Sequence, residues 1–213
     1  FCIVLSGQTI GNIPFLAVIY TGLLAMVFVN GTFSNPGFAL VIAKNTGTIV
    51  DLQLVPLKSW EVGLAHAVAA LTRGFITLLI AIVFTVWFIP GMQLVHPMML
   101  ILVLLLNGLC FGLLGVSFGM WAKNFEALSF VTTFVLQPMI FLAGVFYPIS
   151  QLPGIWAKVS LFNPIHHTVN LVRYSFLGYQ DVSIVTSVLV IVAFTVILFG
   201  TMMVTTKRSL RGV

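Results

Sequence analysis

The segment LILVLLLNGLCFGLLGVSFG, residues 100–119, decides the fold class of this chain. It contains no charged side chain, and its length matches the roughly 20 apolar residues that a helix needs to cross a bilayer. Its apolar residues lack the strict alternation with polar residues that is typical of a β-barrel strand. The segment therefore predicts a transmembrane α-helix and, for the chain, an all-α integral membrane fold.

The composition of the whole chain leads to the same class. Of its 213 residues, 60% are hydrophobic and 6% are charged, whereas a soluble domain carries about 25% charged residues. The net charge of +5 rests on nine basic residues, which is too few for a nucleic-acid-binding patch. The two cysteines, Cys2 and Cys110, lie in apolar runs without a Cys-x-x-Cys pair, so neither a disulfide nor a metal site is predicted.

The same criterion predicts five complete spans and one partial span in a single domain, residues 1–213. Residues 1–6 are interpreted as the end of a helix whose beginning is missing, which makes a six-helix bundle with a truncated first helix. The complete spans are 14–43, 67–89, 98–121, 127–147 and 183–205.

The loops between these spans predict the orientation of the chain in the membrane. One side receives the links 44–66 and 122–126 and the tail from residue 206, and it holds six basic residues against two on the other side. The six are Lys44, Lys58, Lys123, Lys207, Arg208 and Arg211, and the two are Lys158 and Arg173. By the positive-inside rule the first side is cytoplasmic, so the C-terminus is expected in the cytoplasm.

The chain lacks the motifs of an energy-coupling enzyme. It contains no Gly-Lys pair and therefore no P-loop, and it contains no His-Glu-x-x-His metalloprotease motif. No carboxylate lies in a predicted span, which weakens a proton- or sodium-driven mechanism. We therefore expect a non-enzymatic membrane protein that binds no cofactor or metal of its own.

Arg73 is the one charge inside a predicted span. Because a charge deep in lipid is costly, we expect it near the cytoplasmic boundary or facing the bundle interior. Two interpretations stay open. Its side chain either snorkels to head groups or pairs with a neighbouring loop, or it belongs to the transport path or a cytoplasmic gate.

The span at 98–121 contains two pairs of glycines four residues apart, Gly108 with Gly112 and Gly115 with Gly119. Small residues at this spacing allow two helices to approach closely. The pattern is compatible with packing inside one subunit or with dimerisation of two subunits.

The outer segment 148–178 is long but hardly hydrophilic, and it contains two short amphipathic pieces at about 152–162 and 165–177. We expect interfacial or re-entrant helices that either anchor the chain or cover an outward exit. Within it, His166 and His167 are predicted to be polar residues at the outer membrane interface, not a metal site. The candidate residues of the segment are Tyr147, Pro148, Pro153, Trp156, Asn163, Pro164 and Arg173.

The link AKNTGTIVDLQLVPLKSWE, residues 43–61, breaks the apolar pattern with two of the four acidic residues of the chain. Asn45 or Thr46 is predicted to cap a short amphipathic helix within 46–56, which Pro56 ends. On pattern alone this helix is either an interfacial connector or a docking element for a cytoplasmic partner.

At three places the sequence resembles the membrane domain of type-2 ABC transporters, and in particular the small single-domain permeases of bacterial exporters. The segments are KNTGTIVDLQLVPLKSWEVGLAH at 44–66, WAKNFEALSFVTTFVLQPMIFLAGVFYPISQLP at 121–153 and LFNPIHHTVNLVRYSFLG at 161–178. The resemblance covers nearly the whole chain.

The resemblance implies a set of partners. Two permeases, expected to be a homodimer, would form the pore in the bacterial inner membrane, in contact with membrane lipid. Two copies of a soluble ATPase would bind underneath and hold the ATP and Mg. The cargo would be an amphipathic or lipid-linked drug, lipid or glycan moved outward. The alternatives are a secondary transporter or channel without an ATPase, and a non-transporting scaffold subunit.

The resemblance also assigns residues. It identifies the 46–56 segment as a coupling helix that fits a groove on the ATPase, and the 123–126 link as a second contact. The residues implied for coupling are Thr48, Ile49, Asp51, Leu52, Gln53, Lys58 and Glu61. Those implied for the second contact are Lys123, Asn124 and Glu126.

Overall fold

The computed structural model describes residues 9–10, 13–54, 57–88, 94–147 and 154–210. The expected partial span at residues 1–6 lies outside this part of the chain. Two short strands, β1 (Thr9–Ile10) and β2 (Ile13–Pro14), pair antiparallel ahead of the first long helix. All other regular elements of the described residues are helices.

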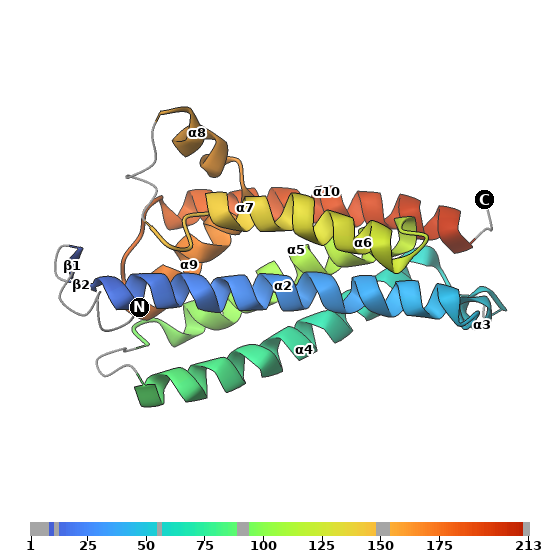
Figure 1. Ribbon diagram of the computed structural model, residues 1–213, viewed down its shortest axis with the longest axis horizontal. Coiled ribbons are helices and arrows are strands. Elements are labelled where there is room, and N and C mark those ends of the chain that lie inside the picture. The colour runs from blue at the N-terminus through green and yellow to red at the C-terminus, as the bar shows by residue number, and fades with distance from the viewer. Residues whose placement is uncertain (1–8, 11–12, 55–56, 89–93, 148–153, 211–213) are drawn as a thin grey trace.

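Five helical segments are long and apolar enough to cross a membrane, and they run along the long axis of the molecule (Figure 1). Four are single helices, and the fifth is assembled from α6, η1 and α7. Their bounds are α2 (Phe15–Asn45), α4 (Ser59–Phe88), α5 (Pro97–Trp121), α6 (Phe125–Val131), η1 (Thr132–Leu136), α7 (Gln137–Leu142) and α10 (Ile184–Leu210). The all-α integral membrane fold is therefore confirmed.

Some helix ends differ from the predicted spans, and α4 and α10 are longer because local hydrogen bonding outlasts the apolar run. α4 begins at Ser59, not at residue 67, and α10 continues to Leu210, past residue 205. The segment predicted at 127–147 ends its helix at Leu142. Within it the π-helix η1 lies just ahead of Pro138, as expected where a proline has no N–H to donate to the preceding turn.

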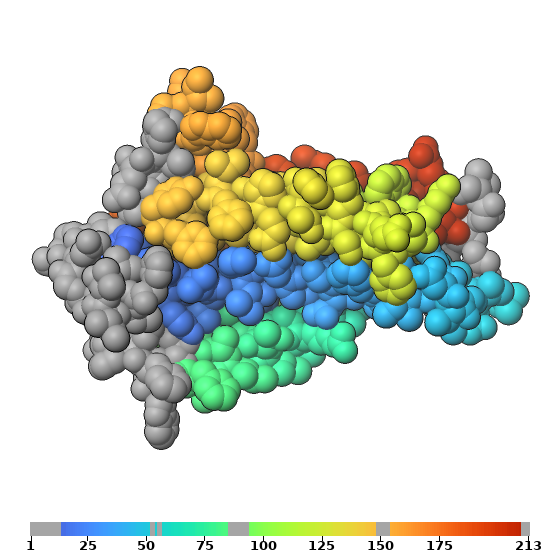
Figure 2. All heavy atoms as spheres, viewed as in Figure 1, coloured from blue at the N-terminus to red at the C-terminus, as the bar shows by residue number. Residues whose placement is uncertain are grey.

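α5 lies at the centre of the bundle and packs against α2, α4, α9 and α10. Buried aromatic residues such as Phe28, Phe33 and Phe111 fill the contact between α2 and α5. The outer faces of α4 and α10 expose large apolar side chains, among them Phe84 and Val196, as expected for helices that contact lipid. Figure 2 shows the α6–α7 segment lying along α2 over one face.

The outer segment contains two helices of different character. α8 (Ile155–Leu161) is mostly exposed and projects from the bundle (Figure 1). α9 (Pro164–Leu177) is almost entirely buried against α2, α5 and α10. The burial of α9 among α2, α5 and α10 agrees with the re-entrant alternative of the expectation. For α8, a place on the membrane surface stays a prediction.

The two ends of the bundle carry different elements. Figure 1 shows α3 (Ile49–Leu54), the link between α5 and α6, and the C-terminal end of α10 at one end. This end gathers the elements that carry Lys44, Lys58, Lys123, Lys207 and Arg208, and we call it the basic end. β1, β2, α8 and α9 lie toward the opposite end.

Candidate functional site

α3 forms an exposed turn of helix at the basic end. The link before it folds back on α2, since Thr46 Oγ1 donates to Ile42 O at 3.0 Å and Thr48 Oγ1 donates to Ala43 O at 3.3 Å. Thr46 therefore completes α2 and does not cap α3, because its hydroxyl is already directed at a carbonyl of the preceding helix. Gly47, at φ +79°, supplies the left-handed turn between the two helices.

The surface that α3 presents is apolar with one acid. Val50 and Asp51 are exposed, Ile49 is half-buried, and Leu54 is 78% exposed. The side chains of Leu52 and Gln53 lie outside the described part of the chain. An apolar side chain this open on a short helix is available to a partner, because few neighbours in the chain cover it.

Two of the predicted coupling residues have a local role. Glu61 Oε2 accepts a hydrogen bond from the backbone N–H of Lys58 at 2.9 Å. Because α4 begins at Ser59, this is the reciprocal half of a capping box, in which an acid in the first turn satisfies the N–H of the capping residue. Glu61 thus fixes the start of α4, and the Lys58 side chain is exposed.

The second predicted contact is a capped helix start. Asn124 Oδ1 accepts a hydrogen bond from Ala127 N at 3.0 Å and caps α6. Lys123 and Glu126 are exposed on either side. Asn124 therefore shapes this link, while the two flanking charges are accessible from outside.

Arg73 lies at the midpoint of α4 with its side chain exposed, and its Nη1 donates to Asn35 Oδ1 at 3.2 Å. The alternative that its side chain faces the bundle interior is wrong, because α4 turns this face outward. The alternative of a place near the cytoplasmic boundary stays a prediction.

A groove of about 430 Å³ runs between α2 and α4 beside Arg73. Its polar lining consists of Asn35, His66, Thr72 and Arg73. Asn35, Thr72 and His66 also hydrogen-bond to backbone carbonyls one helical turn earlier. The groove thus places the guanidinium of Arg73 beside the amide of Asn35 and the hydroxyl of Thr72.

The four glycines of α5 lie against other helices of the same chain. A Cβ at Gly119 would come within 2.8 Å of Gly37 Cα, and one at Gly108 within 2.9 Å of Leu71 Cγ. A Cβ at Gly112 would meet the Ala67 backbone, and one at Gly115 would overlap the carbonyl oxygen of Phe33. The close approach allowed by these glycines is therefore used for α2 and α4.

Residues 115–119 also spell Gly-Val-Ser-Phe-Gly, the letter pattern of a nucleophile elbow. An elbow requires a sharp turn between a strand and a helix, whereas these residues lie inside the continuous helix α5. Ser117 is buried, and its hydroxyl donates to Leu113 O at 2.8 Å. The serine is therefore a helix-packing residue.

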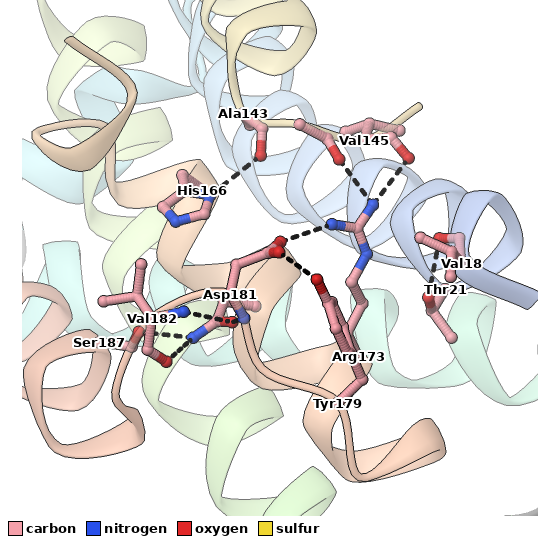
Figure 3. A network of polar contacts seen from close by, with 12 residues as sticks. Val18, Thr21, Ala143, Val145, His166, Arg173, Tyr179, Asp181, Val182 and Ser187 are labelled. Carbon is pink, nitrogen blue, oxygen red and sulfur yellow. Dashed lines mark hydrogen bonds and ion pairs between the residues drawn. The ribbon is translucent and has the colours of Figure 1, made fainter. Parts of the chain in front are cut away.

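A buried ion pair joins α9 to the loop before α10 (Figure 3). Arg173 is fully buried, and its Nη1 lies 3.0 Å from Asp181 Oδ2. Its Nη2 donates to Gly144 O at 2.6 Å and Val145 O at 3.2 Å. Tyr179 donates to the second oxygen of Asp181 at 2.8 Å. Arg173 thus connects the re-entrant helix to the end of α7.

His166 and His167 belong to the same buried region, so they are enclosed by protein and not exposed as interfacial polar residues. His166 Nδ1 lies 3.2 Å from Ala143 O, and His167 lies between Ser187 Oγ at 3.0 Å and Leu161 O at 2.8 Å. Burial lowers the pKa of His166 to about 4, so its ring is neutral near pH 7. Among the described residues no group of three His, Cys, Asp or Glu side chains could hold a metal ion.

Asn170 completes this network and was not singled out by the sequence. Its Oδ1 accepts from Asp181 N at 2.7 Å, and its Nδ2 donates to Val182 O at 2.7 Å and Ser187 Oγ at 2.9 Å. The available signal was spacing, since His166, Asn170 and Arg173 recur every three or four residues and share one helix face.

The other predicted residues of the outer segment mainly position α9. Asn163 caps it by accepting from Ile165 N at 3.0 Å, and its Nδ2 donates to Met139 O at 2.6 Å. Pro164 begins the helix, where its missing N–H has no cost. Tyr147 donates to Phe141 O at 2.8 Å, and Trp156 is exposed on α8. Pro148 and Pro153 lie outside the described residues.

Comparison with known proteins shows that the chain is similar to an inner membrane transport permease and to a nodulation protein. The sequence profile described as ABC-2 type transporter matches residues 2–177. The inner membrane transport permease YadH of Escherichia coli (strain K12) is 32% identical over 196 residues, which cover 90% of this chain and 76% of that protein. Nodulation protein J of Sinorhizobium fredii is 29% identical over 180 residues, which cover 77% of this chain and 63% of that protein.

Proposed function

Because the chain belongs to the ABC-2 type transporter family, we propose that this transport permease is the membrane subunit of an ATP-driven exporter. A separate soluble ATPase, in two copies that carry ATP and Mg, would drive a dimer of the permease. The C-terminus would lie in the cytoplasm, and the membrane would be the bacterial inner membrane, as in the name of the E. coli relative.

The observation that carries this proposal is the exposed surface of α3. Val50 and Leu54 are open at the basic end, beside the single acid Asp51. Apolar side chains in the centre of an interface supply most of its binding energy, while charges at the rim select the partner. We propose that α3 inserts this surface into a groove of the ATPase.

The attachment of α3 to the bundle suits a coupling element. On one side the hydroxyls of Thr46 and Thr48 connect its link to the last carbonyls of α2. On the other side the Lys58–Glu61 cap fixes the start of α4. A displacement of α3 would therefore be transmitted to α2, whose last carbonyls hold its link.

Lys44 extends this connection to the central helix. Its Nζ donates to Gly119 O at 3.0 Å, to Ala122 O at 2.9 Å and to Met120 O. These carbonyls end α5 and have no partner further along the helix. The contact joins the ends of α2 and α5, so we propose that motion of α3 also reaches the core of the bundle.

The groove beside Arg73 is the proposed part of the transport path. A charge at the centre of a membrane-spanning helix costs about 2.5–3.5 kcal/mol or more when it faces lipid, and within the described ranges the side chain of Arg73 bonds to the neutral Asn35. This face is therefore better suited to water, cargo or a second permease copy than to lipid. An amphipathic or lipid-linked cargo would find one cation beside apolar walls.

Co-purification with the ATPase tests the proposal. We expect Leu54→Arg in the full-length permease to weaken ATPase binding at least about tenfold, a loss of about 1.4 kcal/mol. The matched control is Ile155→Arg on α8, because both side chains are 78% exposed and they lie toward opposite ends of the molecule. Equal ATPase binding by wild type and Leu54→Arg, with transport intact, would contradict the coupling role of α3.

A further inference from the structure

A cavity of about 450 Å³ opens at the basic end between the ends of α2, α5 and α10. Three cationic side chains, one tryptophan and two hydroxyl residues line it. These are Lys44, Trp121, Lys123, Thr205, Arg208 and Ser209. The cavity is separate from the groove beside Arg73. The proposed coupling uses its lining residue Lys44, through bonds to the end of α5, but gives the cavity itself no ligand.

The positive charge of this cavity is not neutralised within the described part of the protein. Within the described part of the protein the ion pair joins Arg173 to Asp181, and it lies toward the opposite end of the molecule from this cavity. Lys44 directs its donors at the carbonyls that end α5, so it contributes a fixed charge. Lys123 and Arg208 are exposed, and neither donates a hydrogen bond to a described residue. Their donors are therefore available to an anion.

The surroundings of the cavity indicate the depth at which it lies. Trp121 is 63% exposed, and tryptophan is enriched where a membrane protein meets the head-group layer. On α10, Met203 and Val204 are exposed on the turn that precedes Arg208. An apolar surface thus lies next to a pocket of cations and hydroxyls.

We propose that this cavity binds the head group of an anionic phospholipid. Lys123 and Arg208 contact the phosphate, the Ser209 hydroxyl donates to it, and the acyl chains lie along the exposed apolar surface of α10. Basic pockets between helices on the cytoplasmic side suit such lipids. Lys123 is then a lipid contact, not part of a second ATPase contact. The inference goes beyond the proposed transport function and shares with it only the cytoplasmic placement of the basic end.

Quenching of Trp121 by brominated lipid measures occupancy directly. The full-length permease is placed in nanodiscs of phosphatidylcholine that contain brominated phosphatidylglycerol or, at the same mole fraction, brominated phosphatidylcholine. The signal of Trp121 is the difference between wild type and Trp121→Phe. We expect the anionic lipid to quench Trp121 more strongly, and equal quenching by the two lipids overturns the proposal.

Two variants assign the selectivity to the cavity. Lys123→Gln with Arg208→Gln removes both available cations and is expected to reduce the preference for the anionic lipid about 25-fold, or roughly fivefold per cation. Lys158→Gln, an exposed cation on α8, is expected to leave the preference unchanged. Circular dichroism and gel filtration verify that the variants fold. Undiminished preference in the folded double variant overturns the proposal.

Two competitors distinguish the lipid from other anions. Millimolar inorganic phosphate is expected to leave the quenching in place, because it lacks the acyl chains that hold the head group. Relief of quenching by phosphate would identify a site for a free anion and overturn the lipid assignment. Added ATPase is also expected to leave the lipid bound, and its displacement would identify the cavity as a protein contact and overturn the proposal.

Discussion

Replacing Arg173 by methionine is expected to destabilise the protein strongly, because this side chain is fully buried and neutralises Asp181 at 3.0 Å. Methionine keeps similar bulk but leaves the carboxylate uncompensated and the carbonyls of Gly144 and Val145 without their donor. Removing one partner of a buried ion pair costs about 3–5 kcal/mol. This figure already includes the charge-assisted hydrogen bonds that are lost with it. We expect a loss of about 4 kcal/mol in the free energy of unfolding.

The assay is unfolding in mixed micelles with increasing denaturing detergent, followed by tryptophan fluorescence. The control is Lys158→Met, the same chemical change at an exposed cation, which should stay within about 0.5 kcal/mol of wild type. The difference between the two variants isolates the effect of burial from the effect of losing one positive charge.

A second change tests whether the ion pair itself is responsible. With Asp181→Asn added, the carboxylate no longer needs a counter-charge, so the double variant should recover part of the loss, at least about 1 kcal/mol. Asn170 and Tyr179 still bond to residue 181. The reasoning is refuted if Arg173→Met behaves like the exposed control, or if the two substitutions are simply additive.

Three further expectations follow from single contacts. Gly115→Ala should lower the free energy of unfolding by about 1–3 kcal/mol, since the added Cβ would overlap the Phe33 carbonyl. Gly31→Ala should be neutral or stabilising, because a Cβ added there meets nothing within 4 Å. Equal stabilities of the two variants would contradict the packing role of Gly115. Arg73→Leu should lower transport at least about tenfold while ATPase binding persists, with Arg73→Lys partly active; full transport by the leucine variant would exclude Arg73 from the path. Burial holds the pKa of His166 at about 4, below its ordinary value of 6.5. Between these values the unfolded state binds more protons than the folded state, so the free energy of unfolding should fall as pH drops from 6.5 to 4, by up to about 1.4 kcal/mol per pH unit. His166→Gln should flatten this slope in denaturation measured across that range, and an unchanged slope would contradict the assignment.

The spans could be predicted because hydropathy is a local property. In lipid a backbone must satisfy its own hydrogen bonds, so a long apolar run without charges becomes a helix whatever its neighbours are. The ends of the helices were less predictable. α4 starts at Ser59 because of the Lys58–Glu61 cap, and hydropathy does not report a capping box.

The exposed link at α3 was also accessible to the sequence. Asp51, among apolar residues between two spans, marked a break in the lipid pattern, and the structure has a short helix there. The expected cap at Asn45 or Thr46 was wrong, since Asn45 is the last residue of α2 and the Thr46 hydroxyl bonds to that helix. A hydroxyl between two helices can donate to a carbonyl of the preceding helix or accept from an amide of the following one. The path of the chain decides which of these bonds forms.

The sequence by itself determined the helical membrane class, the positions of the five complete spans, the concentration of basic residues on one set of links and the family. All of these depend on residues close together in the chain or on motifs read in order. Only the tertiary structure decided that α9 is enclosed by α2, α5 and α10, that Arg173 and His166 are buried, and that Arg73 faces outward at mid-helix. Burial is set by which helix covers which face, and that depends on contacts between segments far apart in the sequence.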